Sequence, residues 1–253
     1  MFYSKSLKKF KNIKHCFFSR KNGFSDGVFK SLNCGIGSSD KKENVFKNLE
    51  YVTSKIGCEK NSLITLNQIH SNNVIYFDKK DSIENKLQGD AIVTKVKNVG
   101  IAVLTADCVP ILIYNPKQKI IACIHAGWKG ALNGVIENTF NKFQELNSKS
   151  EDLIAVVGPC IGKENYEVKN DFFEKFTLKD KKNEKYFKKI DNEKYIFDLR
   201  GYVNNELSCL KIKNVENIMM DTFSDSEFFY SYRRSLFNKE KDYGRCISVI
   251  LMT

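Results

Sequence analysis

The chain has 253 residues, of which 42% are hydrophobic and 12% aromatic, so it can bury a sizeable core and is not a disordered polypeptide. Its formal net charge is +11, but the lysines are scattered. The one segment that combines basic residues with aromatics, residues 165–194, also contains many acids, which argues against a nucleic-acid-binding protein. No apolar run approaches the roughly 20 residues of a membrane span, which argues against a membrane protein.

Short apolar segments in the middle of the chain predict a series of β-strands. They lie at residues 62–66, 74–77, 91–94, 100–105, 109–114 and 119–125. The tetrapeptide Asn115-Pro116-Lys117-Gln118 predicts a turn between the last two. After Gly130, apolar residues recur at three- and four-residue spacing and predict one amphipathic helix of about 16 residues.

The C-terminal half alternates between strands and helices. Residues 153–157, 215–220 and 246–251 are predicted strands, and residues 198–210 are a predicted helix with Asp198 near its N-cap. Residues 165–194, rich in Lys, Phe and Tyr, give no clear pattern. The expected fold class is mixed α/β (α+β), with a central mixed β-sheet flanked by helices; the strand order is not predictable from these patterns.

The cysteines and the N-terminal residues bear on the compartment. The eight cysteines have no paired short spacing, so reduced thiols are expected rather than a disulfide framework. The first fourteen residues are basic but are not followed by the apolar stretch of a signal peptide. Both observations favour a cytoplasmic location.

Two of the three histidines lie at the ends of predicted strands, and one cysteine lies between them in the sequence. These are His70, His125 and Cys108, the last beside Asp107 between two apolar runs. Imidazole and thiolate are good zinc ligands, and three protein ligands with an open fourth position are typical of a catalytic zinc site. Asp107 would orient a ligand or accept a proton. The spacing matches no short ligand motif, so hydrogen-bonded histidines and a buried, inert cysteine remain the alternative.

Several segments resemble one known family. Residues 67–70, 89–91, 105–110 and 125–130 resemble the laccase-domain family, the bacterial "polyphenol oxidase" proteins regarded as purine nucleoside phosphorylases. The likeness begins at residues 19–25 and 31–33 and continues through 158–162, 166–168 and 229–234. Because it covers almost the whole chain, we expect one domain over residues 1–253.

The resemblance implies a metal site and a reaction. The family's metal ligands match His70, Cys108 and His125, with Zn²⁺ as the expected cofactor and Cu²⁺ as a possible occupant of the same site. The implied activity is phosphorolysis of adenosine, inosine, guanosine and methylthioadenosine to the free base and a pentose 1-phosphate, with adenosine deaminase activity at the same site. The expected partners are therefore purine nucleosides and phosphate, without nucleic acid or membrane, and the expected state is a monomer or small homo-oligomer.

Residue roles follow from this implied chemistry. Asp107, Cys108 and His125 are the predicted catalytic residues, with Glu167 as a further proton carrier. Only five basic residues are Arg, and guanidinium binds phosphate in a bidentate way. The predicted substrate contacts are Arg20, Gln68 and Arg233, and further phosphate candidates are Arg234 and Arg245, for which a surface ion pair is the alternative. Trp128 would stack on a purine or pack in the core.

Departures from the family pattern and competing functions stay open. Asn22, Ser71, Lys129 and Asp221 replace residues common in the family, which bears on substrate preference rather than on the three ligands.

Three histidines are too few for a multicopper oxidase, which leaves a single-copper oxidoreductase as one alternative. An amidase that edits peptidoglycan precursors is the second alternative, because zinc-activated water also hydrolyses amides.

Overall fold

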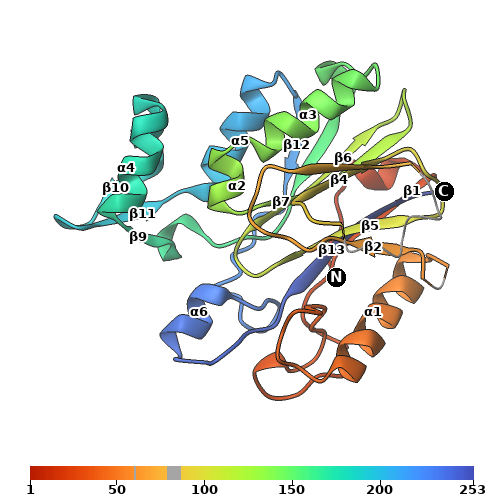
Figure 1. Ribbon diagram of the computed structural model, residues 1–253, viewed down its shortest axis with the longest axis horizontal. Helices are drawn as coiled ribbons and strands as arrows, with labels where there is room; N and C mark the ends of the chain where they lie inside the picture. Colours follow the sequence, from red (N-terminus) through yellow and green to blue (C-terminus); the bar gives the residue numbers. More distant parts are fainter. Residues whose placement is uncertain (60, 79–86) are drawn as a thin grey trace.

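Two β-sheets pack face to face at the centre of the molecule, and helices cover their outer faces (Figure 1). The computed structural model describes residues 1–59, 61–78 and 87–253. One sheet has the order β1 (Ile13–Phe17), β13 (Cys246–Met252), β5 (Gly100–Thr105), β2 (Leu63–Thr65). The other has the order β12 (Asn214–Asn217), β8 (Ile154–Val157), β6 (Val109–Asn115), β7 (Ile120–Ala126), β4 (Ala91–Thr94), β3 (Val74–Phe77).

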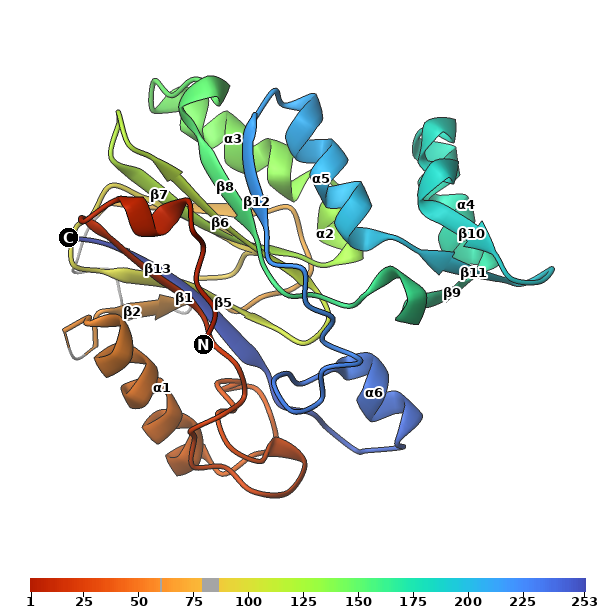
Figure 2. The same cartoon turned by 180° about the vertical axis from the view of Figure 1, so that it is seen from behind.

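The apolar strands lie in the sandwich because both of their faces are covered. Every residue of β6, β7 and β13 is buried, as expected for continuous apolar runs that meet a sheet on one face and a helix on the other. Helix α1 (Lys42–Ile56) packs on the four-stranded sheet through Val52 and Ile56. Helices α3 (Val135–Glu145) and α5 (Leu199–Cys209) pack on the six-stranded sheet (Figures 1 and 2).

A third, smaller sheet extends to one side of the sandwich (Figure 2). It has the order β10 (Phe187–Lys189), β11 (Lys194–Phe197), β9 (Glu167–Lys169) and carries α4 (Asn170–Lys179). These elements lie in and around residues 165–194, where no sequence pattern predicts an element. Their order comes from packed aromatic rings, with the Phe172 ring 5.1 Å from those of both Phe176 and Phe197.

Most of the predicted elements are confirmed, and the differences have local causes. The helix expected after Gly130 is wrong as a single element. It divides into α2 (Trp128–Leu132) and α3, because Gly134 takes a left-handed conformation with φ +90°. The strand expected over residues 215–220 is shorter, since β12 ends at Asn217. Asp198 caps α5 as predicted, accepting a hydrogen bond from the Gly201 amide at 2.8 Å.

The remaining elements are short. Helix α6 spans Tyr232–Phe237, and 3₁₀ helices lie at Leu7–Lys9, Gly27–Phe29, Ser150–Asp152, Lys163–Asn165 and Lys181–Tyr186. The eight cysteines are all free thiols. In the part of the chain that the structure describes, no helix has the length and apolar character needed to cross a membrane.

Candidate metal centre

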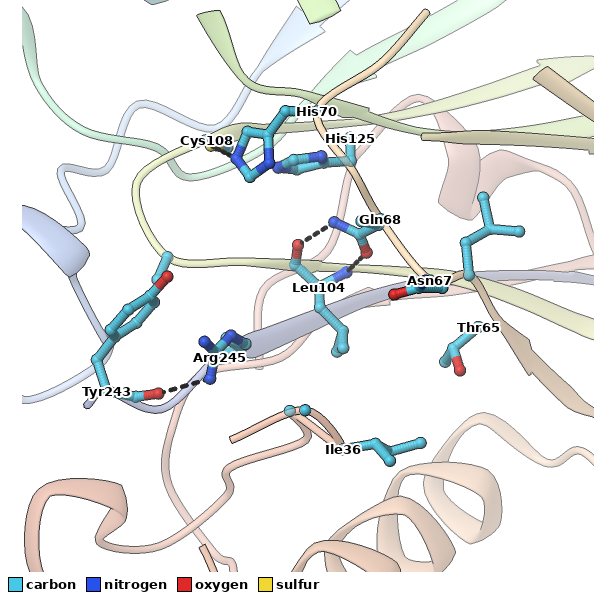
Figure 3. Close-up of a pocket in the computed structure, with 14 residues that line it drawn as sticks. Ile36, Thr65, Asn67, Gln68, His70, Leu104, Cys108, His125, Tyr243 and Arg245 are labelled. Carbon is cyan, nitrogen blue, oxygen red and sulfur yellow. Dashed lines mark hydrogen bonds between the residues drawn. The ribbon is translucent and has the colours of Figure 1, made fainter. Parts of the chain in front are cut away.

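The structure brings the three predicted ligands together. His70 lies in the loop after β2, Cys108 in the turn between β5 and β6, and His125 near the end of β7 (Figure 3). Their ligand atoms all lie within 4.8 Å of one another, and Cys108 Sγ is 3.9 Å from His70 Nε2. The two imidazole rings stand almost perpendicular, at 85°. Among the described residues, this is the one group of three or more His, Cys, Asp or Glu side chains arranged to hold a metal ion.

Asp90, immediately before β4, holds the histidines in place. Its fully buried carboxylate accepts a hydrogen bond from His125 Nδ1 at 2.8 Å, which leaves Nε2 as the nitrogen available to a metal. The same carboxylate accepts the backbone amides of His70 and Ser71, at 3.0 and 2.6 Å. The Ser71 hydroxyl donates to it as well, at 2.7 Å. One carboxylate therefore fixes both the ring of His125 and the loop that carries His70.

Two residues of the centre have an unusual backbone. His70 and Asp107 have φ values of +57° and +86°, a region that residues other than Gly enter at an energetic cost. The Asp90 carboxylate stabilises this conformation at His70 by accepting a hydrogen bond from its backbone amide. Asp107 is held by its own buried carboxylate, which accepts from Thr222 Oγ1 at 2.7 Å and from the Arg233 amide at 2.6 Å. Strain held this firmly beside the ligands is typical of a functional site.

The electrostatics favour an anionic sulfur. Burial raises the pKa of the Cys108 thiol, but His125 and His70 more than offset this and lower it to about 7. Burial lowers the pKa of His125, but Cys108 and Asp90 together raise it to about 9. Burial likewise raises the pKa of Asp90, which hydrogen bonds from His125 and Ser71 bring down to about 2. A metal ion that takes the place of the proton on His125 Nε2 would be stabilised by the negative charges of Cys108 and Asp90.

The donor set fits a small tetrahedral metal ion. Metal–ligand distances of about 2.1 Å for nitrogen and 2.3 Å for sulfur imply a nitrogen–sulfur separation of about 3.6 Å, close to the 3.9 Å between His70 and Cys108. Gly127 keeps the space beside these ligands open. A Cβ there would lie 2.8 Å from His70 Cδ2 and 3.1 Å from Cys108 Sγ. Two imidazoles, one thiolate and an open side suit a metal ion that also binds a further ligand at that side.

The three ligands line one end of a pocket of about 400 Å³. Away from the ligands, Arg245 and Tyr243 lie on one side of the pocket and Thr65 on the opposite side (Figure 3). Gln68, a predicted substrate contact, lies between the ligands and these residues. Its amide nitrogen donates to the Leu104 carbonyl and its amide oxygen accepts from the Leu104 backbone N–H, at 2.8 and 2.7 Å. Gln68 therefore forms part of the pocket wall with its orientation fixed.

Other predicted site residues do not line this pocket. Arg20 stacks on Tyr230 and lines a separate cavity of about 110 Å³ with Arg234. The Arg233 guanidinium donates to the Glu167 carbonyl. The Asp107 carboxylate is turned toward α6, where it accepts from Ser231, Thr222 and Arg233. The Glu167 carboxylate pairs with Lys194, and Trp128 packs 4.7 Å from the Phe172 ring.

The chain matches known proteins over nearly its whole length. Residues 14–253 match the family model for the multi-copper polyphenol oxidoreductase laccases. The chain belongs to this laccase family. One relative, a purine nucleoside phosphorylase of Rickettsia conorii, is 35% identical over 84% of this chain and 89% of its own length. Another, from Haemophilus influenzae, is also a purine nucleoside phosphorylase and is 34% identical over 95% of this chain and 94% of its own length.

Solved structures of similar proteins agree with the fold. A Neisseria meningitidis protein is 29% identical, with a TM-score of 0.85 over 96% of this chain and 95% of that protein. A Bacillus licheniformis hypothetical protein is 25% identical, with a TM-score of 0.88 over 95% of this chain and 93% of that protein. The double-sheet architecture of this laccase-family chain is therefore shared with proteins of known structure.

The family's multicopper name does not suit the histidines of this member. A multicopper site needs many imidazoles, and this chain has three. The third, His15, is buried on β1, where its Nε2 accepts a hydrogen bond from the Ser4 amide at 2.8 Å. The imidazole of His15 is therefore already engaged in a hydrogen bond within the N-terminal segment. The residues of the centre fit one metal ion.

His15 makes the stability of the protein depend on pH. Burial, aided by Lys8, lowers the pKa of His15 to about 4, whereas the unfolded chain has the ordinary value near 6.5. The unfolded state therefore binds more protons between these values, and the free energy of unfolding falls by about 3 kcal/mol as the pH drops from 6.5 to 4. We expect His15→Gln to lack this loss. Urea unfolding of both metal-free proteins from pH 7 to 4 measures it, and parallel pH profiles would contradict the prediction.

Proposed function

We propose that this protein is a zinc-dependent purine nucleoside phosphorylase. The substrates are adenosine, inosine, guanosine and methylthioadenosine, each of which reacts with phosphate to give the free base and a pentose 1-phosphate. The observation that carries the proposal is the His70–Cys108–His125 centre opening into a pocket of about 400 Å³. That volume suits a small ligand of nucleoside size. The names of the relatives support the same activity.

The reaction requires a held phosphate and a stabilised leaving base. A phosphate oxygen attacks C1′ as the bond from C1′ to N9 breaks, its electron pair passes to the base, and the base takes up a proton. Zinc bound by the three ligands would supply a Lewis acid for the negative charge that develops. The protein itself must orient the nucleoside and exclude water around it.

Arg245 is the residue best placed to bind phosphate. Among the described residues that line the pocket it is the one Lys or Arg. Its guanidinium lies 4.3 Å from the Tyr243 ring centre and donates to the Tyr243 carbonyl at 2.9 Å. Asp242 lies 3.6 Å from its other terminal nitrogen. These contacts fix the guanidinium at the pocket wall, where a planar fork recognises phosphate oxygens.

The pocket favours phosphorolysis over deamination. Zinc deaminases use a Glu beside the metal as general acid and base. The described lining residues of this pocket include no Asp or Glu. We therefore propose adenosine deaminase activity only as a minor reaction of the same site, with adenine and ribose 1-phosphate as the main products from adenosine.

The direct experiment is product identification. Zinc-loaded protein is incubated with adenosine and with inosine, with and without phosphate, and the products are separated by chromatography. Free base and ribose 1-phosphate that form only with phosphate would support the proposal. Their absence would refute it. Release of amino acids from peptidoglycan precursor peptides would favour the amidase, and oxidation of phenols by copper-loaded protein would favour the single-copper oxidoreductase.

Arg245 gives a prediction specific to phosphate. Arg245→Gln should raise the KM for phosphate by about tenfold, because one charge-assisted contact to the anion is lost. The KM for inosine should change much less. Steady-state kinetics with phosphate varied at saturating inosine measures this effect. Lys241→Gln, which removes an exposed cation nearby in the sequence, is the control. Equal shifts in the two variants would show that Arg245 acts only through net charge.

A further inference from the structure

A tight turn lines part of the metal pocket. Gly35, Ile36 and Gly37 belong to the same pocket wall as Arg245 and the three ligands (Ile36 in Figure 3). The Ser38 amide donates to the Gly35 carbonyl at 3.0 Å and closes a β-turn whose two central residues are Ile36 and Gly37. That hydrogen bond uses neither of their own amides. Within residues 1–59, 61–78 and 87–253, neither amide has a hydrogen-bond partner.

The turn lies directly against the Arg245 side chain. A Cβ at position 35 would lie 2.7 Å from Arg245 Cδ and 3.2 Å from its Nη1, and the first of these distances is too short for a real contact. The absence of a side chain at Gly35 is therefore what lets the guanidinium lie beside the turn. Two unpaired amides and one guanidinium thus occupy neighbouring positions in one pocket.

Asn33 fixes the turn and Arg245 relative to one another. Its side chain is fully buried, and its Oδ1 accepts hydrogen bonds from the Gly35 and Arg245 amides at 3.0 and 2.9 Å. Its Nδ2 donates to the Ser38 hydroxyl at 2.9 Å. One buried side chain therefore joins both ends of the turn to the start of β13. The donors are held in place before any ligand binds, which lowers the cost of binding one.

The surroundings favour an anion at this point. The described lining residues of the pocket include one Arg and no Asp or Glu. Asp242, 3.6 Å from an Arg245 nitrogen, already accepts hydrogen bonds from the Ser39 amide and hydroxyl and from the Tyr243 amide. Successive unpaired amides of a turn bind oxyanions, because each N–H presents a partial positive charge. A guanidinium beside them adds a full charge and paired donors.

We propose that the backbone amides of Ile36 and Gly37 and the Arg245 guanidinium together form a cradle for inorganic phosphate. The turn supplies two neutral donors, and Arg245 supplies the charge. Gly35 and Asn33 are positioning residues, since they keep the two parts of the cradle together. The identity of the anion rests on the proposed function. In that reaction the cradle holds the phosphate whose oxygen attacks C1′, and it then holds the phosphoryl group of the pentose 1-phosphate.

Direct binding of inorganic phosphate tests the cradle apart from catalysis. Zinc-loaded protein is dialysed to equilibrium against radiolabelled phosphate, and the dissociation constants of variants are compared. Ile36→Pro removes one amide at a turn position that Pro favours. It should bind phosphate about tenfold more weakly than Ile36→Ala, which also loses the side chain but keeps the amide. Equal dissociation constants for these two variants would overturn the proposal.

A pair of glycine variants tests the contact with Arg245. The Cβ of Gly35→Ala meets chiefly the flexible Arg245 side chain, so the protein should fold with its guanidinium displaced. Phosphate should bind about tenfold more weakly than to Gly37→Ala, where a Cβ has no neighbour within 4 Å. The difference should vanish when Arg245→Gln is added to both. A difference that persists there would show that Gly35 does not act through Arg245.

The kinetics separate the cradle from the reaction itself. Phosphate binding that depends on Ile36 and Gly35 as expected, without cleavage of any nucleoside, would refute the proposed function and support the cradle. Phosphorolysis with the same KM for phosphate in Ile36→Pro and Ile36→Ala would refute the cradle and leave the function in place.

Discussion

Cys108→Ala should lower kcat/KM for adenosine phosphorolysis by at least about a thousandfold. Cys108 supplies the one sulfur of the centre, and its anionic form balances the charge of a bound metal. Without it, two imidazoles remain, and a divalent metal would be held far more weakly. A metal's Lewis acidity contributes several kcal/mol to a transition state, which corresponds to this loss of rate.

The matched control is the loss of a thiol elsewhere. Cys209→Ala removes an exposed cysteine at the end of α5 and should keep both metal content and activity. Metal content is measured by elemental analysis after dialysis, alongside the kinetics. Chelation of the parent protein should reproduce the Cys108→Ala activity, and zinc should restore the chelated parent but not the variant. Full activity in metal-free Cys108→Ala would rule out metal-dependent catalysis.

The strands were predictable because apolar runs are a local signal of buried strands. His70, Cys108 and His125 each combine a ligand side chain with a strand end, but their spacing left an alternative open, and the ligand set came from the family resemblance. His70 and Cys108 follow strands β2 and β5 of the four-stranded sheet, whereas His125 lies near the end of β7 in the six-stranded sheet, so the three meet only once the two sheets pack together. The order of the strands was not predictable, since β13 inserts between β1 and β5 from the far end of the chain. Pairing over such separations leaves no local pattern.

The cation of the pocket could not be chosen from residue type alone. The sequence predicted Arg20 and Arg233 as substrate contacts and Arg245 as a further phosphate candidate, all because guanidinium binds phosphate. In the structure, the turn after α6 leads Arg245 into the pocket just before β13, opposite the strand that precedes Cys108. Arg20 and Arg233 instead bind backbone carbonyls. Arg245 lines the pocket because β13 pairs with β5, and its neighbours in the sequence carry no sign of this position.

Asp90 was visible in the sequence only as part of a Gly-Asp-Ala segment without a role. Its importance depends on burial and on five donated hydrogen bonds that arise from residues distant in sequence or across a loop. They come from His125 Nδ1, the Ser71 hydroxyl and the backbone amides of Ile69, His70 and Ser71. Such convergence appears only when β4, β7 and the loop after β2 are placed in space.

Asp90→Asn should therefore weaken metal binding without removing any ligand. The side-chain amide has the size of the carboxylate but no charge. Its NH2 group replaces one acceptor oxygen and therefore faces groups that are themselves hydrogen-bond donors. His125 would lose its fixed ring orientation, and outer partners of this kind change metal affinity by about 10- to 100-fold. We expect a loss of that size in zinc affinity, measured by competition with a chelator. The free energy of unfolding of the metal-free protein should fall by about 2–3 kcal/mol.

Asp221→Asn distinguishes positioning from general stability. Asp221 is also a carboxylate with a lowered pKa, despite the opposing effect of burial, because Gly162, Ser224 and Asn165 donate hydrogen bonds to it. It does not line the metal pocket. Asp221→Asn should lower stability while leaving zinc affinity within about twofold of the parent. If both variants lose stability equally and neither loses zinc affinity, then Asp90 supports the loop of His70 and does not orient His125 for a metal.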